Sequence, residues 1–128
     1  MKLKRLDHFG IEVRDLARAA GFYSSVLGLK VVARLGAEQI LMKCGEQNLA
    51  LFQVARPELT KSEREQIIAN PLGKGHHAFL VSPEDFSTAA ERLREAGVEV
   101  SKLIDWGDHD CIYFLDPDGN LLEVVSYR

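Results

Sequence analysis

The chain of 128 residues lacks a long hydrophobic run and lacks a cluster of basic residues. A helix that spans a bilayer needs about 20 consecutive apolar residues, and the first residues, MKLKRLDHFGIEV, contain no apolar stretch long enough for a signal peptide. The 16 lysines and arginines are scattered and the net charge is −3, so the charge footprint of a nucleic-acid-binding protein is absent as well. These absences predict a cytoplasmic protein that binds neither membrane nor nucleic acid.

Cysteine is also scarce, which limits the covalent and metal-binding options. The only two, Cys44 and Cys111, form neither a disulfide framework nor a metal-ligand spacing. Both lie in apolar runs that resemble strands, which predicts small buried side chains in a reducing compartment. The 46% hydrophobic and 27% charged residues are typical of a globular protein. A chain of this length forms one compact domain, or two half-size modules that share a core.

One pattern, a strand followed by a helix and three strands, occurs twice. The pattern predicts a first module at residues 1–54, a polar connector at 55–74 and a second module at 75–128. We interpret the connector, in which residues 60–69 suit a short helix, as a linker or a lid over a site, with the charged run 61–65 as a solvated helix face. The predicted fold class is therefore α+β, with two βαβββ modules. The expected strands are residues 6–13, 30–35, 39–44, 48–54, 75–81, 98–103, 111–115 and 121–126, and the expected helices are 15–27 and 82–96.

Repetition makes two histidines equivalent. The segment HFGIEV at 8–13 aligns with HHAFLV at 76–81, which places His8 over His76. Each histidine begins one face of the first strand of its module, and a small residue, Gly10 or Ala78, follows two positions later on that face. Small neighbours leave room between the imidazoles. Two structural histidines that happen to share a register are the simpler alternative.

Glu123 breaks the repeat. It lies inside the apolar run 121–125, and a carboxylate in a buried strand is costly unless it is paired or binds a metal. Its counterpart in the first module falls at Ala50 or Leu51, neither of which binds a metal. Two imidazoles and one carboxylate are the ligand set of non-haem Fe(II) enzymes, and Mn²⁺, Ni²⁺ or Zn²⁺ also suits such a site. We therefore predict a divalent metal site made of His8, His76 and Glu123.

Four segments follow one another along the chain in a known order: DHFGIEV at 7–13, FYSSVLGL at 22–29, HHAF at 76–79, and IYFLDPDGN at 112–120 with Glu123. Through them the chain resembles the vicinal oxygen chelate superfamily, which includes glyoxalase I, extradiol dioxygenases, fosfomycin-modifying enzymes and bleomycin-binding proteins. The resemblance implies two βαβββ modules that form an open, barrel-like cup with the metal inside it. It also implies a fourth protein ligand in glyoxalase-like members, and that place is Ala50 here. Single-pair members are commonly homodimers, some with exchanged modules.

Two further residues are candidates for proton transfer. His109 lies in a loop between Asp108 and Asp110, and acidic neighbours tend to raise the pKa of a histidine. Tyr113 lies in the hairpin that ends at Glu123, where its hydroxyl suits donation to a bound substrate. The simpler alternatives are a solvated histidine and a packing tyrosine.

The predicted function is that of a divalent-metal-dependent enzyme acting on a small oxygen-chelating molecule. The three-ligand set, with Ala50 at the fourth place, favours Fe(II)-dependent oxygenation of a catechol-like compound. Two alternatives stay open: an isomerase or lyase of the glyoxalase type, and a metal-free protein that binds a small molecule such as an antibiotic. The resemblance further predicts a homodimer; if modules are exchanged, His8 comes from one subunit and the other two ligands from its partner.

Overall fold

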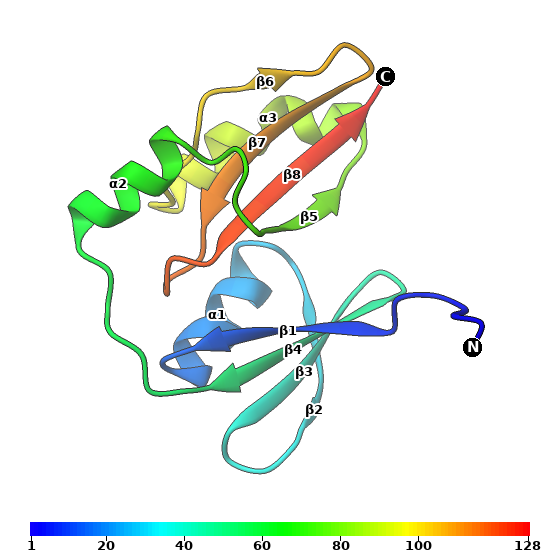
Figure 1. The fold of residues 1–128 in the computed structure, drawn as a ribbon, viewed down its shortest axis with the longest axis vertical. Coiled ribbons are helices and arrows are strands. Elements are labelled where there is room, and N and C mark those ends of the chain that lie inside the picture. The colour runs from blue at the N-terminus through cyan, green and yellow to red at the C-terminus, as the bar shows by residue number, and fades with distance from the viewer. The chain divides into compact units, whose positions relative to one another are not determined.

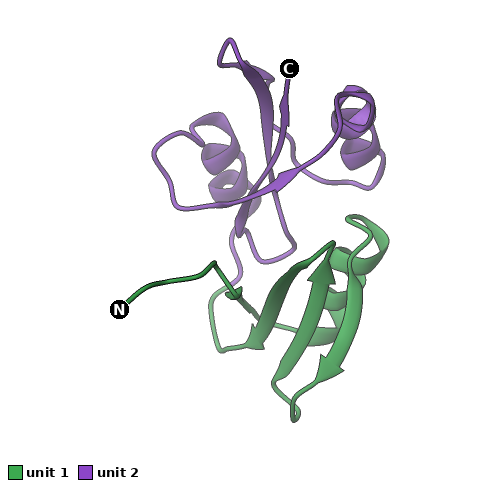
Figure 2. Ribbon diagram, turned by 90° about the vertical axis from the view of Figure 1, so that its right-hand side faces the viewer, with its two compact units in different colours: residues 1–57 green, residues 58–128 purple.

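A computed structural model describes residues 1–128, which divide into two compact units at residues 1–57 and 58–128 (Figure 2). Each unit contains one four-stranded sheet, with strand order β1-β4-β3-β2 in the first and β5-β8-β7-β6 in the second (Figure 1). The predicted α+β class with two βαβββ modules is confirmed. No helix is both long enough and apolar enough to cross a bilayer.

The first unit begins with strand β1 (His8–Val13), which pairs in parallel with β4 (Gln47–Gln53). Between them lie α1 (Leu16–Ser25), β2 (Lys30–Arg34) and β3 (Gln39–Cys44). The Asp15 side chain accepts a hydrogen bond from the Arg18 N–H at 2.9 Å, which caps α1 and satisfies one of its free amides. The core of this unit combines apolar side chains of β1, α1, β3 and β4: Ile11, Val13, Leu16, Ala19, Ala20, Tyr23, Ile40, Met42, Leu49 and Leu51.

The second unit repeats this topology. Strand β5 (His77–Leu80) pairs in parallel with β8 (Leu121–Tyr127), as β1 does with β4. Helix α3 (Pro83–Glu95), β6 (Ile104–Asp105) and β7 (His109–Leu115) complete the module, and α2 (Lys61–Ala69) precedes it. Ser82 caps α3 with Pro83 in the first turn, as the sequence predicts.

The prediction of a strand at residues 98–103 is wrong. Only Val100 makes an isolated bridge, to Phe114, and β6 begins four residues later. Ser101 explains the break. Its backbone N–H donates to the Tyr113 carbonyl at 2.8 Å, but the Tyr113 N–H donates to the Ser101 hydroxyl at 2.9 Å instead of to a backbone carbonyl. A side chain thus replaces a ladder acceptor, and regular pairing stops.

Helices α2 and α3 lie on opposite sides of the second sheet (Figure 2). Ile67 and Ile68 of α2 pack on the face that carries Glu123, while α3 packs on β8 from the other side. The face under α2 therefore has its own apolar cluster, formed by Cys111, Tyr113, Leu115, Leu121 and Val125.

Candidate metal centre

Strand β8 is a central strand of the second sheet and places Glu123 between two neighbours. Glu123 pairs with Tyr113 of β7 on one side and with Ala78 of β5 on the other, so all three side chains share one face. Only 7% of Glu123 is exposed. A carboxylate so buried needs a charged or hydrogen-bonding partner.

His76 supplies that partner. It lies one residue before β5, and its Nε2 is 2.8 Å from the Glu123 Oε2. The other ring nitrogen, Nδ1, is 2.8 Å from the carbonyl oxygen of Lys74. A carbonyl only accepts hydrogen bonds, so Nδ1 carries a hydrogen and donates it to Lys74. Nε2 faces the carboxylate, and this contact is favourable when Nε2 also carries a hydrogen or when both atoms bind one metal ion. Fixing one nitrogen in this way is how proteins orient a histidine whose other nitrogen binds a metal.

Tyr113 completes this corner of the sheet. Its ring meets the imidazole of His76 edge to face, with ring centroids 5.1 Å apart. Burial, and next the negative charge of Glu123, raise the pKa of Tyr113 to about 12. The phenol therefore keeps its proton at neutral pH and can act there as a hydrogen-bond donor.

Cys111 is a neighbour of this site that the sequence interpretation treated only as a core residue. It is fully buried, and burial is the main reason why the pKa of its thiol is raised; the nearby Glu123 raises it further. The alternation of side chains along β7 indicates this position, since Cys111 lies two residues from Tyr113 and therefore on the same face of the sheet.

The turn between β7 and β8 sets the register that brings Tyr113 opposite Glu123. The Asp116 carboxylate accepts hydrogen bonds from the backbone N–H groups of Asp118 and Asn120, each at 2.9 Å. It also accepts one from the side-chain amide of Asn120 at 2.8 Å. The turn is thus held by a buried carboxylate in addition to the dihedral preferences of Pro117 and Gly119.

In the first unit, His8 is the opening residue of β1 and lies opposite Asn48. Its side chain is 53% exposed, and its Nδ1 is 2.8 Å from the Asp7 carboxylate. Gly10 pairs with Ala50, as Ala78 pairs with Glu123 in the second unit. The registers therefore identify Ala50, and not Leu51, as the counterpart of Glu123.

Within the second unit, the side chains present supply only part of a ligand set for a divalent metal. An imidazole nitrogen and a carboxylate oxygen face each other, and both are ordinary ligands of Fe²⁺, Mn²⁺, Ni²⁺ and Zn²⁺. No third His, Cys, Asp or Glu side chain joins them in a cluster. The third protein ligand predicted from the sequence is His8, which belongs to the first unit.

His109 does not join the His76–Glu123 pair. It begins β7 opposite Tyr127, four residues from Tyr113, which corresponds to roughly 13 Å along a strand. Its Nδ1 is 2.6 Å from the Asp108 carboxylate, and its ring lies near the rings of Trp106 and Tyr127, with centroids 6.3 and 4.9 Å away.

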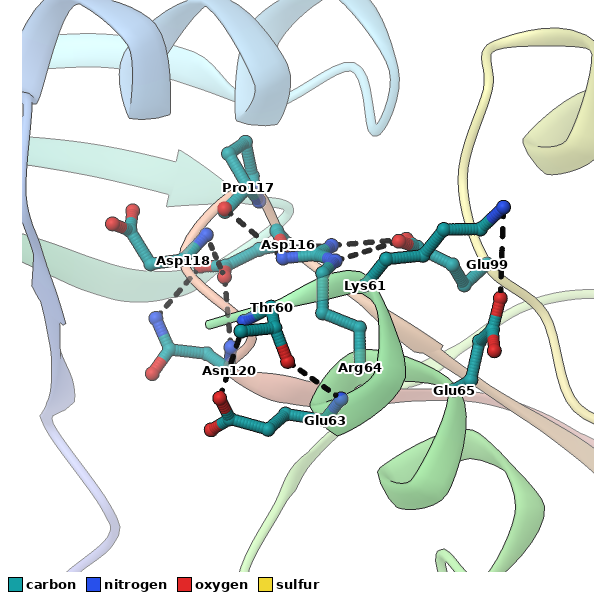
Figure 3. Close-up of polar contacts among 10 residues, drawn as sticks. All are labelled: Thr60, Lys61, Glu63, Arg64, Glu65, Glu99, Asp116, Pro117, Asp118 and Asn120. Atoms are coloured by element: carbon teal, nitrogen blue, oxygen red, sulfur yellow. Dashed lines mark hydrogen bonds and ion pairs between the residues drawn. The ribbon is translucent and has the colours of Figure 1, made fainter. Parts of the chain in front are cut away.

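Arg64 holds α2 against the second module (Figure 3). Its guanidinium donates two hydrogen bonds to the Glu99 carboxylate, at 2.6 and 2.9 Å. It also donates to the carbonyl oxygens of Asp116 and Pro117, at 2.8 and 3.1 Å. The prediction that residues 61–65 form a solvated helix face is therefore wrong at Arg64, whose side chain is only 16% exposed. Lys61 and Glu65 do form an exposed pair.

The Arg64–Glu99 pair predicts a pH-dependent stability. The hydrogen bonds from Arg64 lower the pKa of Glu99, so this carboxylate stabilises the folded state above its unfolded pKa of about 4.3 and loses that effect as the pH falls through the folded value. We expect Glu99→Gln to lower the free energy of unfolding by about 1 kcal/mol at pH 7, since the pair is partly solvent-screened. The difference from wild type should shrink toward pH 3, measured by urea unfolding.

A matched control is Glu65→Gln, which removes the carboxylate that pairs with Lys61 on the exposed surface of α2. Its effect should stay below about 0.5 kcal/mol at both pH values. Equal losses in the two variants, or a Glu99→Gln loss that does not change with pH, would contradict the assigned role of Arg64.

Comparison with known proteins places these features in a family. Residues 5–124 match the Glyoxalase/Bleomycin resistance protein/Dioxygenase superfamily. Glutathione transferase FosA of Serratia marcescens is 33% identical over 123 residues, covering 95% of this chain and 80% of the relative. Catechol-2,3-dioxygenase of Bacillus subtilis is 27% identical over 92% of this chain, which spans only 40% of that protein.

Solved structures agree on the fold. The structure of lactoylglutathione lyase from Agrobacterium tumefaciens matches with a TM-score of 0.74 and 25% identity, covering 98% of this chain and 96% of that one. Together with the sequence match over nearly the whole chain, this establishes that the protein belongs to the glyoxalase/bleomycin resistance protein/dioxygenase superfamily.

Proposed function

We propose that this protein is a divalent-metal-dependent enzyme that acts on a small oxygen-chelating substrate, with His8, His76 and Glu123 as the metal ligands. The observation that carries the proposal is the contact of His76 Nε2 with Glu123 Oε2, 2.8 Å apart, in which the carboxylate is buried and the imidazole side chain is 30% exposed. The Lys74 carbonyl fixes the imidazole so that Nε2 faces the carboxylate, an arrangement suited to metal binding.

A polar reaction at the substrate oxygens is the activity that the surrounding residues support best. A bound divalent metal would act as a Lewis acid on a substrate oxygen. Tyr113 lies beside both second-unit ligands and keeps its proton, so we assign it the donation of a hydrogen bond to negative charge that develops on the substrate. The similarity to a glutathione transferase and to a lactoylglutathione lyase favours this candidate.

Fe(II)-dependent oxygenation of a catechol-like molecule is the second candidate. The two-histidine, one-carboxylate count favours it, as does the similarity to catechol-2,3-dioxygenase. In either reaction we assign proton transfer near the metal to Tyr113 and not to His109, because His109 lies at the start of β7, four residues from Tyr113.

Metal binding is expected to depend on all three proposed ligands. Titration with Mn²⁺, Fe²⁺, Ni²⁺ and Zn²⁺, followed by calorimetry, should give saturable binding, and His8→Ala, His76→Ala and Glu123→Gln should each weaken it more than the 10- to 100-fold typical of residues that only support a ligand. His77→Gln is the matched control, since His77 pairs with Leu122 and lies on the opposite face of β5. No binding by the wild-type protein, with retained affinity for a small molecule, would favour a metal-free binding protein.

Tyr113→Phe is predicted to separate binding from turnover. The variant keeps the ring that packs against His76 and loses only the hydroxyl, so metal affinity should stay unchanged while kcat falls roughly 100-fold, as for loss of one preorganised donor. The assay panel is fosfomycin with glutathione, the hemithioacetal of methylglyoxal and glutathione, and catechol with dioxygen under Fe²⁺. An unchanged kcat on the active substrate would remove Tyr113 from the mechanism.

We also propose a homodimer whose cups take His8 from one subunit and His76 with Glu123 from the other. The two units are compact by themselves, and residues 54–60 between them form no helix or strand, so the chain permits such an exchange.

A complementation experiment tests the exchange. His8→Ala and Glu123→Gln should each be inactive alone. When they are unfolded and refolded together, roughly one quarter of wild-type activity should return, because half of the dimers are mixed and each mixed dimer has one intact cup. No recovery, with mixed dimers present, would show that each cup is built from a single chain.

A further inference from the structure

The second unit has a cavity on the face of its sheet opposite Glu123. It lies between α3 and the strands β7 and β8 and has a volume of about 460 Å³, within the range of pockets that hold small molecules. Arg94 of α3 and Ser126 of β8 line it, and the apolar wall includes Phe86, Ala90, Leu103 and Ile112.

The local structure explains why space remains there. Helix α3 packs on β8, and the small side chain of Ala90 faces the cavity in the middle of the helix. Ile112 of β7 forms part of the floor, two residues from Asp110, which pairs with Ser126 across the strands. Residues 110, 112 and 126 share one face, whereas Tyr113 and Glu123 point to the other. The cavity is therefore separate from the proposed metal centre.

Ser126 is the first sign that the cavity receives a polar ligand. Only 5% of this residue is exposed, and its hydroxyl has no hydrogen-bond partner in the protein. A buried hydroxyl without a partner is unfavourable, and most such groups in proteins are satisfied. The neighbouring Asp110 is already engaged, because its carboxylate accepts a hydrogen bond from Arg128 at 2.6 Å.

Charge gives the second sign. Arg94 lies in the last turn of α3 and takes part in none of the ion pairs of the structure. The other guanidinium of the lining, that of Arg128, is bound by two carboxylates, those of Asp105 and Asp110. Arg94 is thus the guanidinium of the lining that no carboxylate binds, and a planar guanidinium suits a carboxylate, to which it can donate two parallel hydrogen bonds.

We propose that this cavity is a second ligand site, which binds a small aromatic carboxylate that carries a further oxygen. The carboxylate pairs with Arg94, the ring packs against Phe86 and Ile112, and the second oxygen bonds the Ser126 hydroxyl. The proposal does not depend on the metal centre.

Titration with 4-hydroxybenzoate, followed by ¹H–¹⁵N NMR, tests the proposal. We expect saturable shifts at residues of α3 and β8, with a Kd on the order of 1 mM or tighter for a ligand of this size. Arg94→Gln should weaken binding roughly 10-fold or more and Ser126→Ala roughly 2- to 10-fold, the ranges for one charged and one neutral hydrogen bond. Arg92→Gln, a change in the same helical turn outside the lining, should leave the Kd unchanged.

Two further variants show which face of the sheet holds the ligand and whether the Ser126 hydroxyl is unpaired. Glu123→Gln should bind 4-hydroxybenzoate as wild type does; if it abolishes binding, the ligand occupies the metal-centre face and the proposal is wrong. Ser126→Ala should unfold at the same temperature as wild type or higher without ligand, because it removes an unpaired buried hydroxyl. A clearly lower melting temperature, or no saturable binding by wild type, would overturn the proposal.

Discussion

The second module is organised around a carboxylate that is buried in a central strand. Glu123 has a strand on each side and an apolar cluster on its own face, so its charge can be tolerated only with a partner at close range. His76 provides this partner at 2.8 Å, and the Lys74 carbonyl orients the imidazole. This contact depends on three features of the module: the turn at Asp116, the pairing of Tyr113 with Glu123, and the position of β5 beside β8.

Much of this could be predicted from the sequence because the chain repeats itself. Alternating apolar residues, helix caps at Asp15 and Ser82, and the glycines that follow α1 and α3, Gly28 and Gly97, recur in the same order, and they specify a strand, a helix and three strands in each module. The parallel pairing of first and last strands then identifies Ala50 as the residue that replaces the carboxylate in the first module. Glu123 is also predictable as a site residue, because burying a carboxylate without a partner costs free energy.

The remaining errors and omissions have a common cause. Ser101, Arg64 and Cys111 have roles that depend on partners distant in the sequence. Ser101 accepts a hydrogen bond from the Tyr113 N–H through its hydroxyl, although the sequence pattern places it in a regular strand. Arg64 reaches Glu99 and the β7–β8 turn, although the pattern places it on a solvated helix face. Periodicity identifies which face a side chain occupies but does not identify the partner across that face.

Arg64 also links the connector to the candidate site. Its hydrogen bonds to the carbonyls of the turn hold α2 over the face that carries Glu123 and Tyr113, where Ile67 and Ile68 cover the apolar cluster. These two side chains exclude water from the apolar cluster, and electrostatic interactions are stronger next to such an apolar region than in water. Arg64 thus anchors the connector helix, and a lid role for the connector stays a prediction.

The most direct test of the central claim is a crystal structure of the protein grown with Mn²⁺, with anomalous scattering recorded to locate the ion. We predict Mn²⁺ bound to the Glu123 carboxylate and to Nε2 of His76, with Nδ1 still directed at the Lys74 carbonyl and His8 as the third protein ligand. An intact contact between His76 and Glu123 with no ion between them, at a Mn²⁺ concentration that saturates other sites, would contradict it.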